Sequence, residues 1–313
     1  MKNVLITGAC GQIGSELVVE IGKNIPAKHL IATDVSKALP LFKDHATFAY
    51  LDVLDRDRLL AVVTENEIDT IFHMAAILSA RGEQNPQLAY NINLGGLFNV
   101  LEVARKRGVN RVISPSTIAV FGPDAPKENT PNETPLNPTT MYGVTKVAGE
   151  KLMQYYHGKF GVDTRGLRYP GIISSATAPG GGTTDYAVDM YIHAVKQLPY
   201  DCFVKDDTPL PFMYMPDAIK AIVDLANADG SKLKRRNYNV NAMSLTPRQI
   251  EDSIKARIPE FSCGYKPDYR QAIAESWPWS IDDSTARAEW DWQPDYDLDA
   301  MSDDMIANLR SLR

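Results

Sequence analysis

A short glycine pattern near the start of the chain constrains the fold more than any other feature. The segment GACGQIG, residues 8–14, follows the apolar run Val4–Ile6 and opens an amphipathic helical pattern. In such a unit the first glycine permits a tight turn, the second lets the backbone approach a pyrophosphate, and the third lets the helix pack close to the sheet. The helix N-terminus adds N–H donors for the anion. The pattern predicts a dinucleotide site at Gly8, Gly11, Gln12, Ile13 and Gly14.

The first half of the chain alternates short apolar runs with longer helical patterns. Several of the apolar runs contain almost no polar residue, which is typical of strands covered on both faces. Strand followed by helix, repeated, predicts an α/β fold built on a Rossmann-type doubly wound parallel sheet, with its ligand outside the carboxyl ends of the strands. Strands are expected at 2–7, 29–33, 47–51, 69–74, 111–115 and 164–168, and helices at 12–23, 56–66, 86–106 and 140–160.

Acidic and small residues follow the expected strands. Asp34 ends the second strand, and at this position a carboxylate accepts the adenosine ribose hydroxyls and repels a 2′-phosphate, which favours NAD over NADP. The alternative for Asp34 is a turn or helix-capping residue. Asp52, after the third strand, is placed to meet the adenine edge. The fourth strand ends in the small residues of HMAA, 73–76, where we interpret His73 as a packed structural histidine.

The regular alternation of expected strands and helices ends after Gly171. We interpret residues 1–171 as an NAD-binding Rossmann domain and residues 172–313 mainly as a smaller C-terminal substrate lobe, with some segments near 210–241 returning to the first domain. In this second part we expect helices at 217–227 and 247–257, the latter capped by Thr246, and a strand at 238–241.

A tyrosine and a lysine stand at helical spacing in the segment MYGVTKVAGEKL. Tyr142 and Lys146 are four residues apart and share one helix face, so the cation can lower the tyrosine pKa and make Tyr142 a general base. Ser116 and Thr117 end the fifth strand region and bring hydroxyls to the same crevice, where one of them can orient a substrate oxygen. The alternatives are an exposed Tyr–Lys pair and two turn-capping hydroxyls.

Composition narrows the possible partners and compartments. The formal charge of -6 gives no electrostatic attraction to nucleic acid, and no stretch approaches the 18 apolar residues of a membrane helix. Cys10, Cys202 and Cys263 form no CxxC pair, which favours reduced thiols and a cytoplasmic location. No group of residues has the spacing of a metal site, so we expect no metal.

The glycine loop, Asp34, the Ser116–Thr117 pair and Tyr142-x-x-x-Lys146 together resemble the extended short-chain dehydrogenases/reductases of the UDP-galactose-epimerase-like group. Longer stretches narrow the resemblance to the short-chain type of L-threonine 3-dehydrogenase; among them are SPSTIAVFGPDAP, APGGGTTDYAVDM and WPWSIDDSTARAEWDWQPDYDL. One departure matters, because the usual catalytic serine position holds Thr117. A threonine hydroxyl still donates and accepts, and Ser116 is the neighbour that could share its role.

The resemblance implies oxidation of the L-threonine β-hydroxyl to 2-amino-3-ketobutyrate, with NAD as the cofactor. It implies that Tyr142 takes the hydroxyl proton, that Thr117 holds the oxygen, and that Lys146 binds the nicotinamide ribose. It also implies that Asn93 supports Lys146 through water and backbone, and that the chain forms a homodimer through helices such as 86–106 and 140–160. The alternative for the apolar faces of these helices is packing in the internal core. The further cofactor contacts that it implies are Val53, Met74, Ala75, Ala76 and Tyr169.

A small zwitterionic substrate needs partners for its carboxylate and its ammonium. The glycine-rich segment before residue 186 offers amides and hydroxyls at Gly181, Thr183 and Thr184, and a carboxylate at Asp185. Ser79 and Arg81 follow the fourth strand and face the same crevice. The alternative for each is a loop or cap residue, and the glycine run could also be a hinge that closes over substrate.

Two other functions fit parts of the pattern. A nucleotide-sugar epimerase or dehydratase on the same fold would need room and cations for a nucleoside diphosphate, and the acidic C-terminal half offers no evident basic pocket. A catalytically inert NAD-binding sensor would keep the glycine loop, but such proteins commonly lose the Tyr–Lys pair that is present here.

Overall fold

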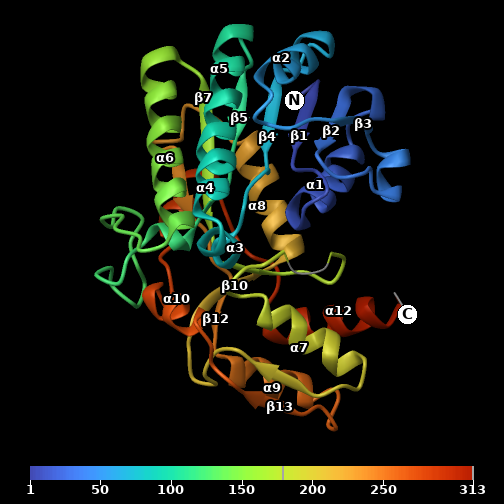
Figure 1. The fold of residues 1–313 in the computed structure, drawn as a ribbon, viewed down its shortest axis with the longest axis vertical. Helices are drawn as coiled ribbons and strands as arrows, with labels where there is room; N and C mark the ends of the chain where they lie inside the picture. The colour runs from blue at the N-terminus through green and yellow to red at the C-terminus, as the bar shows by residue number, and fades with distance from the viewer. Residues whose placement is uncertain (178–179, 312–313) are drawn as a thin grey trace.

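The computed structural model describes residues 1–177 and 180–311, and a parallel sheet covered by helices forms its larger part (Figure 1). The strand order is β11-β7-β5-β4-β1-β2-β3, with β6 paired to β7 beside this path, and every one of these pairs is parallel. The strands are β1 Val4–Thr7, β2 Leu30–Asp34, β3 Thr47–Tyr50, β4 Thr70–His73, β5 Arg111–Ile113, β6 Ser116–Thr117, β7 Asp163–Tyr169 and β11 Asn237–Asn239.

Helices cover both faces of this sheet. The apolar sides of α1 and α8 pack in one buried cluster with side chains of the sheet, and those of α2, α5 and α6 pack in another. The helices of this part are α1 Gln12–Gly22, η1 Ala27–His29, η2 Pro40–Asp44, α2 Arg56–Glu65, α3 Ser79–Gln84, α4 Pro86–Ala89, η3 Tyr90–Gly96, α5 Leu97–Arg107, η4 Ile118–Val120, α6 Met141–Phe160, α8 Met215–Asn227 and α11 Ser284–Trp290.

A smaller region lies below the carboxyl ends of the strands, around α7, α9 and α12 in Figure 1. In it β10 pairs in parallel with β8 and antiparallel with β12, and β9 pairs with β13. A separate apolar cluster joins these elements. They are β8 Gly171–Ile173, α7 Tyr186–Val195, β9 Tyr200–Cys202, β10 Leu210–Tyr214, β12 Met243–Leu245, α9 Pro247–Lys255, β13 Cys263–Tyr265, α10 Arg270–Ser276 and α12 Leu298–Ser311.

The predicted doubly wound α/β fold is confirmed, and the expected strands of the first half are all present with ends that move by at most two residues. The single helix expected at 86–106 is wrong in detail, because a π-helical stretch, η3, separates α4 from α5. Two glycines lower helix propensity there. Gly96 also lies so close to Val53 that a Cβ would sit 2.7 Å from a methyl group.

The segments near 210–241 divide between the two regions. α8 packs against α1 and β7, and β11 forms the edge of the main sheet beside β7. β10 instead belongs to the small sheet, because its partners are β8 and β12. The helix expected from Asp217 begins at Met215, and the Asp217 carboxylate accepts the backbone N–H groups of Asp295 and Tyr296 at 2.8 and 3.2 Å.

Candidate active site

A cavity of about 370 Å³ lies where the carboxyl ends of the sheet strands meet the smaller region. The glycine loop, the Tyr–Lys pair and the segment before α7 all contribute to its wall, although they are far apart in the sequence. The predicted site residues that line it are Gly8, Gly11, Gln12, Ile13, Gly14, Met74, Ala76, Ser79, Ser116, Thr117, Tyr142, Lys146, Tyr169, Thr183, Thr184 and Asp185.

The three loop glycines are required for different reasons. Gly8 has φ +68°, and a Cβ there would lie 2.5 Å from the backbone nitrogen of Ala75. A Cβ on Gly14 would lie 2.2 Å from the carbonyl oxygen of Gly8, so this glycine permits the close turn. At Gly11 the nearest protein atom to a Cβ would be 3.3 Å away, and the space beside it belongs to the cavity. The packing of the chain therefore demands glycine at Gly8 and Gly14, whereas Gly11 leaves room for a ligand.

The N-terminus of α1 faces the part of the cavity beside Gly11, and no side chain caps it. The N-cap residue Gly11 makes no side-chain hydrogen bond, and the first turn holds no acidic residue. Gln12, Ile13 and Gly14 line the cavity. Unpaired N–H groups at a helix N-terminus favour an anion. The cradle around Gly11 and this uncapped terminus fit the pyrophosphate of a dinucleotide.

Asp34 lies at the end of β2 and holds the glycine loop in place. Its carboxylate accepts the backbone N–H of Cys10 at 2.9 Å and that of Ser36 at 2.9 Å. Burial and the nearby Asp34 charge raise the pKa of the Cys10 thiol to about 11, and the thiol donates to the Lys37 carbonyl at 3.4 Å. Cys10 is thus a protonated packing residue that links the loop to the end of β2.

Five predicted cofactor residues are not part of the cavity wall: Asp34, Asp52, Val53, Ala75 and Asn93. Asp52 and Val53 follow β3 outside it; the Asp52 carboxylate accepts the Leu54 N–H at 2.9 Å, and Val53 packs against η3. Ala75 lies against Gly8. Tyr169 is on the cavity wall, but its hydroxyl is directed to the Ala218 carbonyl of α8, so its ring rather than its hydroxyl is available to a ligand.

Tyr142 and Thr117 are hydrogen-bonded partners. Burial raises the pKa of Tyr142 to about 12, and the hydrogen bond from Thr117 acts in the opposite direction. The Thr117 hydroxyl also accepts the Ala119 N–H at 3.2 Å, which leaves its own proton for donation. The two hydroxyls therefore form one polar centre on the cavity wall.

Lys146 lies one helical turn after Tyr142, with its ammonium nitrogen 5.7 Å from the centre of the tyrosine ring. The ammonium donates to the Pro115 carbonyl at 2.8 Å. Burial lowers the pKa of Lys146 to about 8, and the Glu150 carboxylate acts against this shift. Lys146 is thus a fixed donor whose proton is easier to release than that of an exposed lysine.

Three side chains near Lys146 form hydrogen bonds with other protein groups: Ser116, Asn93 and His73. The Ser116 hydroxyl donates to Glu150 at 2.5 Å. The Asn93 amide contacts both backbone groups of Ile77 and the Thr145 hydroxyl, at 2.7 to 3.1 Å. Asn93 lines a smaller cavity behind Lys146 rather than the main one. His73 is buried, and its Nδ1 contacts the Thr7 hydroxyl at 2.8 Å, as a packed structural histidine would.

Of the predicted substrate residues, all line the cavity except Gly181. The hydroxyls of Ser79 and Thr183 lie 3.1 Å apart, and the Thr183 N–H donates to Ser79 at 3.2 Å. The Asp185 carboxylate accepts the N–H groups of Gly181 and Gly182, each at 2.8 Å. Burial raises the pKa of Asp185, and these two hydrogen bonds act against the shift. Thr184 and the exposed Arg81 also line the cavity.

Sequence reasoning missed two residues next to this centre, Glu150 and Arg168. They form a buried ion pair with an N–O distance of 2.8 Å, and Ser116 binds the same carboxylate. The signal was the spacing, because Glu150 follows Lys146 by four residues. Trp277, which also lines the cavity, carried no comparable signal.

Among residues 1–177 and 180–311, no group of three or more His, Cys, Asp and Glu side chains is arranged to hold a metal ion. Within the same residues, no helix has the length and apolar character needed to cross a membrane.

Comparison with known proteins gives one family and a consistent set of neighbours. The model of the NAD dependent epimerase/dehydratase family matches residues 4–241. An uncharacterized epimerase/dehydratase of Staphylococcus saprophyticus is 50% identical over 313 residues, which covers 98% of this chain and 96% of that protein.

Solved structures are similar over the whole chain. L-threonine dehydrogenase from Phytophthora infestans is 51% identical with a TM-score of 0.96, and 100% of both chains is covered. The enzyme of the same name from Clostridium difficile is 47% identical with a TM-score of 0.96, covering 100% of this chain and 98% of that one. A monomeric L-threonine 3-dehydrogenase from a metagenome is 46% identical with a TM-score of 0.95, covering 99% of each chain.

Proposed function

Because this chain belongs to the NAD-dependent epimerase/dehydratase family, we propose that it is an NAD-dependent L-threonine 3-dehydrogenase, which oxidises the β-hydroxyl of L-threonine to 2-amino-3-ketobutyrate. The observation that carries the proposal is that Tyr142, Thr117 and Lys146 line the same cavity as the glycine loop. A base for a hydroxyl proton and a cradle for a dinucleotide therefore share one space, as hydride transfer requires.

The chemistry of the residues follows from their contacts. Bound NAD would supply the hydride acceptor. Thr117 donates to the substrate oxygen, and Tyr142 takes the hydroxyl proton as general base. Because burial raises the pKa of Tyr142 to about 12, the tyrosine is protonated in the free enzyme and the Thr117 and Lys146 donors must favour its phenolate during oxidation. Oxidation is therefore expected to be faster at alkaline pH.

The charges of the cavity support a small zwitterionic substrate. Of the described residues that line it, the charged ones are Arg81, Lys146 and Asp185. With Lys146 beside Tyr142, one cation and one carboxylate remain on the substrate side, which matches a carboxylate and an ammonium. Ser79 and Thr183 add hydroxyls between them. We assign the substrate carboxylate to Arg81 and these hydroxyls, and the ammonium to Asp185.

The competing function is a nucleotide-sugar epimerase or dehydratase of the same family. A nucleoside diphosphate carries two charged phosphates, and these normally need several cations or helix N-termini. Arg81 is the one cation on the substrate side among the described lining residues. An inert NAD sensor is disfavoured because the tyrosine and lysine line the cavity together. Formation of NADH with L-threonine, and none with a sugar nucleotide, separates these functions.

The direct test uses Tyr142→Phe, which keeps the ring and removes the base. We expect the variant to lose at least about 100-fold in kcat, the usual size of a general-base contribution, because no other hydroxyl replaces it. NAD affinity, measured by fluorescence titration, should stay within about twofold because the glycine loop is intact. The matched control is Tyr155→Phe, an exposed tyrosine on the same helix, which should keep full activity. Full activity of Tyr142→Phe contradicts the assignment.

We also propose that two copies of the chain associate through α5 and α6, which lie side by side in Figure 1. Exposed apolar residues gather on these helices and on η3: Tyr90, Phe98, Val144, Tyr155 and Phe160 are each 42–56% exposed. Such a surface is typical of an interface between subunits. Sedimentation of the wild type and of Tyr155→Arg measures the association, and a monomeric wild type contradicts it.

We further propose that the protein works in a reducing, cytoplasmic compartment, because its three cysteines are free. Imaging of the tagged protein tests this location.

A further inference from the structure

The short helix α3 lies between the substrate side of the main cavity and the start of α6. Ser79 and Arg81 of α3 line the main cavity. Gly82 of the same helix is buried, and a Cβ on it would lie 3.8 Å from the Cβ of Tyr142 and 3.9 Å from its backbone nitrogen. The backbone of α3 therefore packs directly against the proposed base, while the side chains before and after it reach the substrate end of the cavity.

Glu83 joins α3 to the first residue of α6. Its carboxylate oxygen Oε1 accepts the backbone N–H of Met141 at 2.7 Å. Met141 begins α6 and directly precedes Tyr142. The first N–H groups of a helix have no partner inside the helix, and a carboxylate is a strong acceptor for them because its charge also complements the helix dipole. Glu83 thus fixes the turn of α6 that carries Tyr142.

A second set of contacts holds the same turn from another element, η4. The Thr140 hydroxyl accepts the Gly143 N–H at 3.1 Å. A Cβ on Gly143 would lie 2.2 Å from the Ala119 carbonyl oxygen of η4, so α6 and η4 are in close contact. η4 begins directly after Thr117, the hydrogen-bond partner of Tyr142. The position of Tyr142 therefore depends on η4 and on α3, and Glu83 provides the polar contact from α3.

The described contacts of Glu83 point to α6 rather than to the cavity. Among residues 1–177 and 180–311, the Met141 N–H is the hydrogen-bond partner of the Glu83 side chain. Glu83 is exposed and is not part of the wall of the main cavity. An effect of this carboxylate on the reaction must therefore pass through α6. Because exposed side chains tolerate substitution, its variants are expected to fold.

The oxidation is sensitive to this contact because the transfer of the proton depends on distance. A general base must lie about 2.6 to 3.2 Å from the oxygen whose proton it takes. A misplacement of about 1 Å can cost about 100-fold in rate. The proposed substrate site holds the amino-acid carboxylate on Ser79 and Arg81 of α3, whereas the base is on α6. The distance between the substrate hydroxyl and Tyr142 Oη is therefore set by how α3 and α6 are joined.

We propose that Glu83 is a positioning residue for the oxidation, because its bond to Met141 fixes Tyr142 relative to a substrate held on α3. This inference rests on the proposed function, which supplies both the base and the substrate side chains. It adds a residue outside the cavity to the groups that determine the rate. It also gives α3 two tasks, which are to hold the substrate and to hold the base at a fixed distance from it.

The kinetic test is Glu83→Ala, which removes the acceptor. We expect kcat for L-threonine oxidation to fall about 10-fold, because the base is less well placed. KM and NAD affinity should stay within about twofold of the wild type, since Ser79, Arg81 and the glycine loop are unchanged. With L-threonine deuterated at the β-carbon, the isotope effect on kcat should rise, because the chemical step becomes slower relative to product release.

Glu83→Gln is the conservative variant, because its amide oxygen can still accept the Met141 N–H. We expect its kcat to lie within about threefold of the wild type, since a neutral acceptor makes a weaker bond of the same geometry. A kcat as low as that of Glu83→Ala would overturn the proposal, because the charge of Glu83 and not its bond to α6 would then matter. Wild-type kcat and isotope effect in Glu83→Ala would also overturn it.

The matched control is Gln249→Ala in the smaller region. Gln249 is exposed, and its side-chain oxygen accepts the Thr246 N–H at 2.8 Å at the start of α9, away from the wall of the main cavity. This substitution also removes a hydrogen bond at the start of a helix, and we expect unchanged kcat, KM and isotope effect. An equal fall of kcat in both variants would overturn the proposal, because the loss of any helix-end bond would then explain it.

Hydrogen exchange tests the hold on α6 without any substrate. The N–H groups of Gly143 and Val144 donate to the hydroxyl and the carbonyl of Thr140, and Glu83 takes no part in either bond. In Glu83→Ala both amides should exchange about 10-fold faster, because the first turn of α6 opens more often. Glu83→Gln should exchange like the wild type. Unchanged exchange in Glu83→Ala overturns the proposal even if L-threonine is oxidised.

Failure of the proposed function gives a different result. A wild type that does not oxidise L-threonine contradicts the proposed substrate, and hydrogen exchange still decides whether Glu83 holds the first turn of α6. The Glu83 variants are then compared on whichever alcohol reduces NAD, with the same expected fall of kcat and the same rescue by glutamine.

Discussion

At the scale of single residues, glycine is needed at two positions of the same loop for different reasons. A Cβ on Gly14 would meet the Gly8 carbonyl at 2.2 Å, whereas a Cβ on Gly11 would meet it at 3.3 Å. The first approach is impossible without moving backbone, and the second needs a shift of a few tenths of an ångström. Glycine at position 14 is thus explained by the fold, and glycine at position 11 by the ligand.

This difference predicts separate outcomes for two alanine substitutions. Gly11→Ala should change the free energy of unfolding by less than about 1 kcal/mol but weaken NAD binding about 10-fold, because the methyl group enters the pyrophosphate cradle. Gly14→Ala should lower the free energy of unfolding by about 3 kcal/mol, as overpacking does. Urea unfolding and NAD titration measure the two quantities. Equal loss of stability in both variants would contradict the explanation.

His73 predicts how stability depends on pH. Its pKa is about 3 in the folded chain against the ordinary value of 6.5, so the unfolded chain binds its proton first as pH falls. The stabilisation is complete above pH 6.5 and is lost at about 1.4 kcal/mol per pH unit between there and pH 3. From pH 7 to pH 5 the wild type should lose about 2 kcal/mol more than His73→Gln. Urea unfolding at both pH values measures these losses, and an equal loss in the two proteins would refute this explanation.

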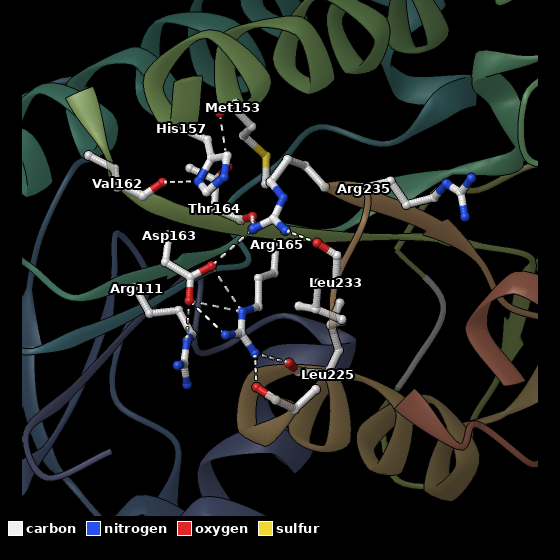
Figure 2. Close-up of polar contacts among 12 residues, drawn as sticks. Arg111, Met153, His157, Val162, Asp163, Thr164, Arg165, Leu225, Leu233 and Arg235 are labelled. Carbon is white, nitrogen blue, oxygen red and sulfur yellow. Dashed lines mark hydrogen bonds and ion pairs between the residues drawn. The ribbon is translucent and has the colours of Figure 1, made fainter. Parts of the chain in front are cut away.

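At the scale of elements, one buried arginine attaches α8 to the main sheet (Figure 2). Arg165 on β7 is 1% exposed and donates to the carbonyls of Leu225 and Ala228 at the end of α8, each at 2.7 Å. Asp163 on the same strand accepts from Arg165 at 2.7 Å and from Arg111 at 3.1 Å. The cation thus satisfies carbonyls that a helix end leaves without partners.

Arg165→Met should lower the free energy of unfolding by about 3 to 5 kcal/mol, because it leaves the buried carbonyls of Leu225 and Ala228 without this donor and removes one of the cations that pair with Asp163. Lys205→Met is the control, since Lys205 and Glu275 form an exposed pair at 3.0 Å, and its effect should be much smaller than that of Arg165→Met. Chemical denaturation compares the two. A similar small effect in both would mean that α8 is held by apolar packing alone.

The elements also show what could be predicted from sequence. Glycine spacing and apolar runs predicted the strands around the cofactor loop because those signals are local. The π-helical η3 was missed because it depends on contact between Gly96 and the distant Val53. The small β8-β10-β12 sheet was missed because its strands are short and are joined by long connections. Glu150 was missed for a related reason, since its partner Arg168 lies on another element.

At the scale of the whole molecule, hydroxyl pairs connect the two regions across the main cavity. Ser79 on α3 meets Thr183 before α7, and Ser15 on α1 meets Thr177 at 3.2 Å. Glu16 on α1 accepts from Ser174 at 2.7 Å. Each bond joins a helix of the main sheet to the chain that leads into the smaller region. The geometry of the substrate end therefore depends on how these regions are held together.

The Ser79–Thr183 pair gives the sharpest test of this coupling. Thr183→Val removes its hydroxyl, and we expect KM for the amino-acid substrate to rise about 10-fold, the equivalent of one hydrogen bond, with NAD affinity unchanged. Ser79→Ala should act similarly. If the two hydroxyls act through their mutual bond, the KM of the double variant should be no higher than that of either single variant.

The control is Thr208→Val. Thr208 is a buried threonine that is bonded to Gln271 away from the cavity, so its substitution should leave KM unchanged. Additive effects of Thr183→Val and Ser79→Ala would mean that each hydroxyl binds the substrate separately and that the bond between the regions plays no part in recognition.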